Sequence, residues 1–152
     1  MKLKKATLSD AETIWRMQTD AFAELLARYQ DFDRSPGNEP FEKIQQRIAQ
    51  PYTSLYYIIA DGDVIGAIRV VDRKDGSRKR IGPLFVMPKF RNRGYGQQAI
   101  IEAEKIHGTD NWELDTILQE PGNCHLYEKM GYHRTGKTEI INDRMTIVFY
   151  EK

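Results

Sequence analysis

The chain has 152 residues, of which 40% are hydrophobic, 11% aromatic and 30% charged, and its mean hydropathy is -0.63. These values predict one globular domain over residues 1–152 and are not typical of a disordered chain. The 23 Lys and Arg residues against 22 Asp and Glu give a net charge of +1, which argues against nucleic acids and anionic membranes as partners. The sequence has no apolar window long enough for a membrane span and no signal-peptide-like N-terminal stretch, so we expect a cytoplasmic protein.

The first half of the sequence predicts a strand, two helices and a hairpin. Ser9 and Asp10 can cap the first helix, and Pro36-Gly37 interrupts the pattern in segment 30–40, which we expect to form a lid. The dipeptide Asp61-Gly62 is the preferred type I′ turn between two strands. The expected ranges are 2–8 for the first strand, 9–29 and 41–50 for the helices, and 52–60 and 63–71 for the hairpin strands.

The second half predicts a further hairpin turn at Asp75-Gly76, then alternating strands and helices. The expected strands are 81–88, 112–118, 132–140 and 143–151, and the expected helices are 94–107 and 123–130. The helix 94–107 carries an apolar stripe of Ala99, Ile100, Ala103 and Ile106. Gly108 follows the helix and is suited to end it. The resulting order, βααβββαβαββ, predicts a mixed α/β (α+β) domain around one main sheet.

The stretch RNRGYG, residues 91–96, lies where an expected strand passes into an expected helix. The first N–H groups of a helix have no intrahelical partner, and the helix dipole makes this end attractive to anions. Gly94 and Gly96 allow a phosphate to approach the backbone, and Arg91 and Arg93 add positive charge. The stretch therefore fits a pyrophosphate, although a solvated connecting loop has the same local features. It matches neither a Walker A loop nor the GxGxxG dinucleotide fingerprint.

Two motifs resemble those of the GNAT superfamily of N-acetyltransferases. The stretch 83–100 is similar to motif A, [RQ]-x-x-G-x-[GA], here Arg91, Gly94 and Gly96 after Val86-Met87-Pro88. The stretch 123–132 resembles motif B, with matching residues at Asn123, Tyr127, Lys129, Gly131 and Tyr132. The order of elements also agrees, so the resemblance implies a GNAT-like acyl-CoA N-acyltransferase fold with a single, mostly antiparallel sheet flanked by helices.

The resemblance implies acetyl-CoA as a co-substrate. The family holds the pyrophosphate on backbone N–H groups of the motif A loop, and its pantetheine arm enters a gap between the motif A strand and the next strand. The coenzyme-binding residues implied in this way are Phe85, Val86, Met87, Arg91, Asn92, Arg93, Gly94, Tyr95, Gly96, Gln97 and Asn123.

Tyr127 occupies the family's general-acid position. Aminolysis of a thioester develops an oxyanion, which a backbone N–H can stabilise, and releases a thiolate. A tyrosine with a pKa of ~10 stays protonated at neutral pH and can protonate a thiolate whose thiol has a pKa of ~8.5. A tyrosine on an amphipathic helix is also a common core residue, and Asn123, after Pro121-Gly122, is also a suitable helix N-cap.

The general base is not evident from the sequence. Glu113 and Asp115 share one face of the strand 112–118, but they could equally face solvent. Glu120, His107 and the acidic residues of the lid stay open as candidates. The single cysteine, Cys124, has no recognisable catalytic partner and no second cysteine for a disulfide, so we expect a small buried side chain.

Acceptor recognition depends on the lid in this family. Its acidic and aromatic residues could attract a cationic amine, whereas an ordinary solvated loop is the alternative; they are Tyr29, Asp31, Phe32, Asp33, Glu39 and Glu42. The basic run 73–80 is typical of a charged hairpin tip but could contact the 3′-phosphate of the coenzyme. We expect a small-molecule or peptide amine as acceptor, no nucleic acid, no membrane, and a monomer or homodimer.

The function expected from these observations is acetyl transfer from acetyl-CoA to a primary amine, directly in a ternary complex. No activated nucleophile is visible, so an acyl-enzyme is not expected. The alternative is a non-catalytic sensor or interaction module that binds an acyl-CoA. Steady release of thiol in the presence of amines distinguishes the two.

Overall fold

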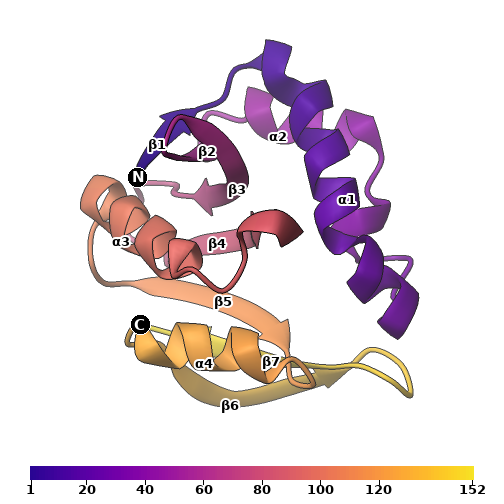
Figure 1. The fold of residues 1–152 in the computed structure, drawn as a ribbon. Helices are drawn as coiled ribbons and strands as arrows, with labels where there is room; N and C mark the ends of the chain where they lie inside the picture. The colour runs from indigo at the N-terminus through magenta and orange to yellow at the C-terminus, as the bar shows by residue number, and fades with distance from the viewer.

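The computed structural model describes residues 1–152, and its helices and strands follow the expected order (Figure 1). One sheet contains all seven strands in the order β1-β2-β3-β4-β5-β7-β6, and every neighbouring pair is antiparallel except β4 and β5. The strands are β1 (Lys2–Lys5), β2 (Thr53–Ala60), β3 (Asp63–Val71), β4 (Lys79–Val86), β5 (Trp112–Ile117), β6 (His133–Ile140) and β7 (Thr146–Glu151). The helices are α1 (Ala11–Tyr29), α2 (Phe41–Ala49), α3 (Tyr95–His107) and α4 (Pro121–Lys129). The predicted mixed α/β class and mostly antiparallel sheet are confirmed.

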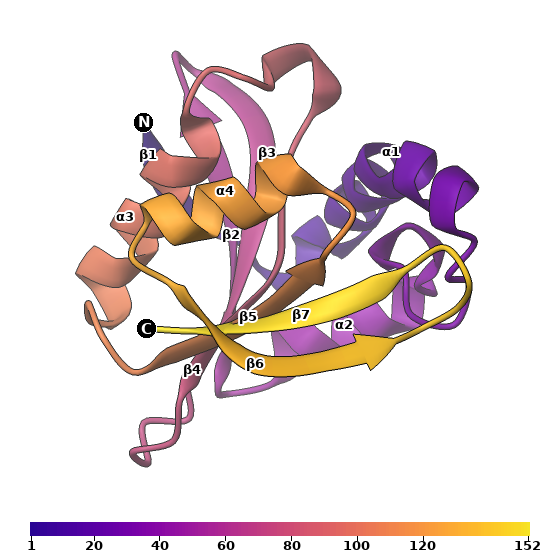
Figure 2. The ribbon, with the colours of Figure 1, turned by 90° about the horizontal axis from the view of Figure 1, so that it is seen from below.

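The helices form two layers, with α1 and α2 on one face of the sheet and α3 and α4 on the other (Figures 1 and 2). The larger core lies under α3 and α4, where Trp112 and Tyr150 are fully buried. A smaller core lies under α1 and α2 around Ile14, Ile44 and Leu55. None of the helices combines the length and apolar character needed to cross a membrane.

Local turn signals in the sequence are reproduced by the backbone. Asp61 and Gly62 both have positive φ, 52° and 81°, as a type I′ turn between β2 and β3 requires. Gly108 ends α3 with φ 107°, and its N–H donates to the Glu104 carbonyl at 2.8 Å. Glycine tolerates these angles because it has no Cβ.

Two local predictions are wrong. Of the two residues expected to cap the first helix, Asp10 is the N-cap of α1, whereas Ser9 lies within a 3-10 turn, Leu8–Asp10, that precedes it. Thr7 caps this turn, and its N–H donates to the Asp10 carboxylate at 2.8 Å in a capping box. Ile106 is 55% exposed, because it lies at the edge of the buried face of α3. Glu104 turns inward instead and accepts a bond from Lys152 Nζ at 2.8 Å.

Candidate active site

The sheet opens between β4 and β5. These strands pair only at Lys79–Trp112 and Arg80–Glu113, and no further register joins them. The rest of β4, residues 81–86, therefore has an edge toward β5 without a strand partner, as the resemblance implied. Two cavities reach this gap, one from each end.

The first cavity, which we call the α3 groove, has a volume of about 460 Å³. It is bordered by α1, the end of β4, the loop before α3, and α4. Nine of the residues expected to bind the coenzyme line it: Phe85, Val86, Arg91, Asn92, Gly94, Tyr95, Gly96, Gln97 and Asn123. Met87 and Arg93 do not line it.

The loop before α3 presents free backbone N–H groups. Asn92 and Gly94 have positive φ, 63° and 80°, which folds the loop back over the start of the helix. The first N–H with a backbone partner is that of Gln98, bonded to the Gly94 carbonyl at 3.1 Å, so the N–H groups of residues 92–97 are available. A Cβ on Gly94 would meet no atom within 4 Å, so the groove is open at this point. These residues fit a pyrophosphate.

Arg91 holds the loop in place rather than extending into the groove. Its Nε donates to the Val86 carbonyl and its Nη2 to the Ala21 carbonyl, both at 2.9 Å. The loop is thereby joined to β4 and α1. Arg93 instead lies over the ring of Phe90, 5.9 Å from its centroid.

The end of β4 directs one backbone donor into the gap. Met87 donates its N–H to the Ile65 carbonyl of β3 at 2.7 Å. Because successive residues of a strand direct their backbone groups to opposite sides, the Val86 N–H points away from β3, toward the gap. Of these two expected backbone contacts, Val86 is therefore the one with a free donor.

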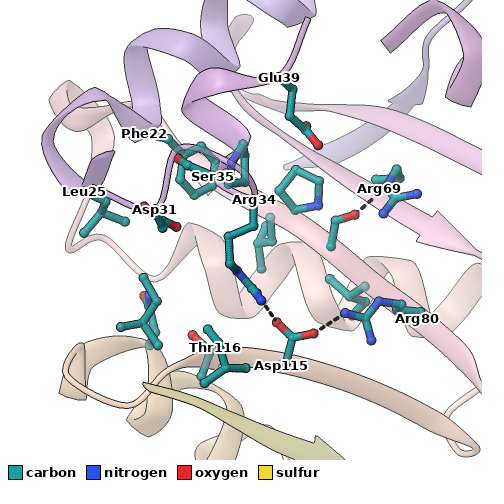
Figure 3. Close-up of a pocket in the computed structure, with 18 of the residues that line it drawn as sticks. Phe22, Leu25, Asp31, Arg34, Ser35, Glu39, Arg69, Arg80, Asp115 and Thr116 are labelled. Atoms are coloured by element: carbon teal, nitrogen blue, oxygen red, sulfur yellow. Dashed lines mark hydrogen bonds and ion pairs between the residues drawn. The ribbon is translucent and has the colours of Figure 1, made fainter. Parts of the chain in front are cut away.

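The second cavity, which we call the arginine cavity, has a volume of about 220 Å³ (Figure 3). It lies between the lid and the sheet and extends to α4 and β7. Its charged lining residues are Arg34, Arg47, Arg69, Arg80, Asp31, Glu39 and Asp115. None of the four arginines was expected from the sequence to line an acceptor site, and Arg80 belongs to the basic run 73–80. An arginine inside the apolar strand 63–71 is the sequence feature that could have indicated such a site.

Asp115 joins the lid to the sheet. Its two carboxylate oxygens accept from Arg34, at 3.3 Å, and from Arg80 (Figure 3). Both oxygens of this carboxylate are therefore occupied by ion pairs with the protein itself. Glu113, on the same face of β5, is exposed and does not line the cavity.

Of the acidic residues on the lid itself, Asp31 and Glu39 line the cavity and Asp33 does not. Burial alone would raise the pKa of Glu39, but two bonds of 2.8 Å from Arg47 and a contact with Lys43 lower it overall. Phe32 is 57% exposed, and neither it nor Asp33 lines the cavity. The lid therefore contributes two carboxylates to the cavity, Glu39, which is neutralised, and Asp31, which has no ion pair.

The two cavities meet at Tyr127. Both are lined by Phe22, Leu25, Leu84, Asn123 and Tyr127. Tyr127 is 9% exposed, and burial, followed by the negative charge of Asp115, raises the pKa of its hydroxyl strongly. No hydrogen bond contributes to this shift in pKa.

Other motif B residues have clear structural positions. Helix α4 begins at Pro121 with Glu120 as N-cap, so the alternative of Asn123 as N-cap is wrong. Cys124 is 5% exposed and its thiol lies 3.7 Å from the Ile117 carbonyl, which confirms the buried side chain. Lys129 is exposed.

The remaining candidate bases differ in position. His107 lies between the Tyr56 hydroxyl and the Asp72 carboxylate, each at 2.9 Å, and lines neither cavity. Glu120 lines the α3 groove and is held by Arg28 at 2.8 Å. Asp31 lines the arginine cavity without an ion pair, and burial raises the pKa of its carboxyl.

The sequence profile of the acetyltransferase (GNAT) family matches residues 15–132, and the chain belongs to this family. No curated protein sequence matches it significantly.

Solved structures share the fold at low sequence identity. PaiA N-acetyltransferase from Thermoplasma acidophilum, in complex with coenzyme A, has a TM-score of 0.76 at 17% identity, covering 99% of this chain and 98% of its own. Spermidine N-acetyltransferase from Vibrio cholerae, in complex with CoA and spermine, has a TM-score of 0.75 at 16% identity, covering 98% and 92%. Microcin C7 self-immunity acetyltransferase MccE, in complex with acetyl-CoA and AMP, has a TM-score of 0.73 at 14% identity, covering 99% and 90%.

Proposed function

We propose that this protein is an acetyl-CoA-dependent N-acetyltransferase that transfers the acetyl group directly to a primary amine in a ternary complex. The observation that carries the proposal is the meeting of the α3 groove and the arginine cavity at Tyr127. One cavity has the features of a donor site and the other those of an acceptor site. The complexes of structural relatives with coenzyme A or acetyl-CoA support the donor assignment.

The donor would be held mainly by the backbone. The free N–H groups of residues 92–97 suit its pyrophosphate, and the unpaired edge of β4 suits its pantetheine arm. The Val86 N–H would stabilise the oxyanion that develops on the thioester carbonyl. Asn123 lines both cavities and can hydrogen-bond the coenzyme near the reacting group.

Tyr127 would act as general acid toward the departing thiolate. Its raised pKa keeps the hydroxyl protonated at every pH of interest. The thiolate forms in the same water-poor position, where burial raises its proton affinity as well, so the transfer does not face the full difference in pKa. As the amine nitrogen bonds to the acetyl carbon, the C–S bond breaks and the tyrosine proton passes to sulfur. Asp31, which has no ion pair, can hold the acceptor's ammonium group until one proton passes to bulk water and leaves the neutral amine that attacks. The nitrogen of the intermediate then loses its second proton, and a proton from water restores the hydroxyl of Tyr127.

Two measurements test this function. Calorimetric titration with acetyl-CoA, with ATP as a control anion, is expected to give saturable binding of acetyl-CoA and no comparable binding of ATP. Thiol release is then measured with a panel of primary amines, and sustained turnover is expected. Absence of acetyl-CoA binding, or equal binding of ATP, contradicts the donor site. Binding without thiol release with any amine contradicts catalysis.

A further inference from the structure

Arg69 is a partly buried arginine that lines the arginine cavity. Its neighbours along β3, Ile68 and Val70, are 0% exposed and belong to the core under α3 and α4. Side chains alternate along a strand, so Arg69 points to the opposite face, under α1 and α2. Its partner in register on β2 is Leu55, which belongs to the apolar core of that face. A charged side chain in this position needs an explanation.

Only one of the hydrogen-bond donors of the Arg69 guanidinium has a partner within the protein. Its Nε donates to the Gly82 carbonyl, and no carboxylate forms an ion pair with it (Figure 3). A bulge in β4 creates the Nε contact: Ile68 pairs with Leu84 and Val70 with Ile81, so Gly82 and Pro83 both lie opposite Arg69.

The two terminal nitrogens of Arg69, Nη1 and Nη2, have no partner in the protein. They are not sealed in the interior either, because the fully buried polar side-chain atoms without a partner are Glu104 Oε2 and the Tyr132 hydroxyl. The free nitrogens of Arg69 therefore border the cavity that the residue lines.

The electrostatics of the cavity leave this charge uncompensated. Burial, with the nearby charge of Arg47, lowers the pKa of Arg69 to about 10, so the guanidinium is still charged at neutral pH. The cavity's other cations share its carboxylates: Arg34 and Arg80 both contact Asp115, whereas Glu39 is bound by Arg47 and Lys43. Asp31 is the remaining carboxylate, and it carries no ion pair.

Such a charge distribution favours a ligand with an anionic group. A charge that is partly removed from water and has no partner of opposite charge is unfavourable, and a ligand that supplies the opposite charge relieves this cost. A planar guanidinium with two free terminal nitrogens matches the two oxygens of a carboxylate or phosphate. A polycation would instead meet the positive charge of Arg69 at the end of the cavity.

We propose that the arginine cavity selects a primary amine that also carries a carboxylate or phosphate group, with Arg69 as the anion-binding, specificity-determining residue. This inference rests on the proposed function for its reaction, but not for its binding site. Asp31 and Arg69 lie on different sides of the cavity, so a small acceptor can place its ammonium group near the first and its anionic group near the second (Figure 3).

The wild-type protein tests the substrate class with matched pairs. Thiol release from acetyl-CoA is measured with alanine against alaninamide and with O-phosphoethanolamine against ethanolamine, and spermidine is included as a polycation. The anionic member of at least one pair is expected to have a kcat/KM about 100-fold above its neutral partner. The pair that shows the difference identifies carboxylate or phosphate as the preferred group. A higher kcat/KM for spermidine than for both anionic amines overturns the inference.

The variant Arg69→Met tests the residue, with Arg73→Met as matched control. Arg73 is exposed, follows β3, and stacks on Tyr52 with its Cζ 4.6 Å from the ring centroid. Arg69→Met is expected to lose about 100-fold in kcat/KM for the anionic amine while its kcat/KM for the neutral partner and its Kd for acetyl-CoA stay unchanged. Arg69→Lys keeps the positive charge but lacks the two parallel terminal N–H donors of the guanidinium, so its loss of kcat/KM for the anionic amine is expected to be smaller. An unchanged preference for the anionic amine in Arg69→Met overturns the inference.

A binding measurement separates this inference from the proposed function. Thermal unfolding of wild type and Arg69→Met is followed with free coenzyme A and increasing alanine or O-phosphoethanolamine. If no amine is acetylated but an anionic amine raises the Tm of wild type and not of Arg69→Met, the proposed function fails and the anion site stands. If the neutral amines are acetylated and the anionic amines neither react nor raise the Tm, the proposed function stands and the anion site fails.

Discussion

The α3 groove and the arginine cavity meet at one tyrosine but are built in opposite ways. The groove presents mainly backbone groups: free N–H groups of residues 92–97, positive φ at Gly94 and an unpaired edge of β4. The cavity presents mainly side chains, among them four arginines and three carboxylates from the lid, α2, β3, β4 and β5. A backbone site tolerates many side-chain substitutions, whereas a site of paired charges changes its preference with a single one. We therefore expect substitutions to leave the preference for the acetyl donor unchanged and to alter the preference for the acceptor amine easily.

The largest effect is expected where the two regions meet. Tyr127→Phe removes the proton donor and should lower kcat by about 100-fold or more, with the Kd for acetyl-CoA nearly unchanged, in steady-state assays and calorimetry. Tyr132→Phe is the control, because Tyr132 is 3% exposed, its ring lies 6.1 Å from that of Tyr127, and its hydroxyl has no partner. Equal kcat for Tyr127→Phe and wild type would remove Tyr127 from the mechanism.

A substitution at Gly94 tests the groove alone. Gly94→Val forces a branched side chain into φ 80°, which costs about 1–3 kcal/mol of backbone strain and displaces the N–H groups. We expect the Kd for acetyl-CoA to rise about 10-fold to 100-fold, because this is the effect of losing one hydrogen bond to a charged group.

The control for Gly94 is Gly62→Val in the β2–β3 turn. Gly62 has φ 81°, and like Gly94 it has nothing within 4 Å of a built Cβ, so the strain is matched without touching the groove. Both variants should lose Tm, but only Gly94→Val should lose acetyl-CoA affinity. Equal losses of affinity would mean that strain, not the site, is responsible.

A substitution at Asp115 tests the cavity alone. Asp115→Asn leaves Arg34 and Arg80 facing each other without their shared carboxylate. We expect KM for the acceptor to rise about 10-fold, the free energy of unfolding to fall by about 1–2 kcal/mol, and the Kd for acetyl-CoA to stay constant. Glu113→Gln, an exposed position two residues earlier, should change none of these. A parallel loss of acetyl-CoA affinity in Asp115→Asn would contradict the separation of the two regions.

The smallest effect concerns Asp31 and the pH dependence of stability. Burial raises the pKa of its carboxyl above the ordinary 3.8, so the folded state binds this proton more tightly than the unfolded state. Wild-type stability therefore falls as pH rises from about 3.8 through the folded pKa, and the loss remains at neutral pH. Asp31→Asn removes the charged carboxylate and with it this loss of stability, so its Tm should be slightly higher than that of wild type at pH ~7. The difference should vanish in acid. The exposed Asp33→Asn is the control, and a lower Tm for Asp31→Asn at neutral pH would contradict the sign.

The sequence alone predicted the parts of this protein that depend on near neighbours in the chain. The order of elements, the type I′ turn at Asp61-Gly62 and the glycines before α3 follow from residues a few positions apart, because helix periodicity, strand alternation and positive φ are local properties. The motifs around residues 91–96 and Tyr127 were recognisable for the same reason.

The tertiary structure decided which charges are paired and which are free. Glu39 belongs to an acidic segment in the sequence, yet Arg47 and Lys43 neutralise it. Asp115 lies in a strand with no arginine near it in the sequence, yet Arg34, 81 residues away, and Arg80 form ion pairs with its carboxylate. Arg69 lies in an apolar strand, and only the alternation of β3 and the bulge in β4 place its free nitrogens in the cavity. The charge state and partners of a side chain depend on every element packed around it, so the acceptor site becomes visible only in the folded protein.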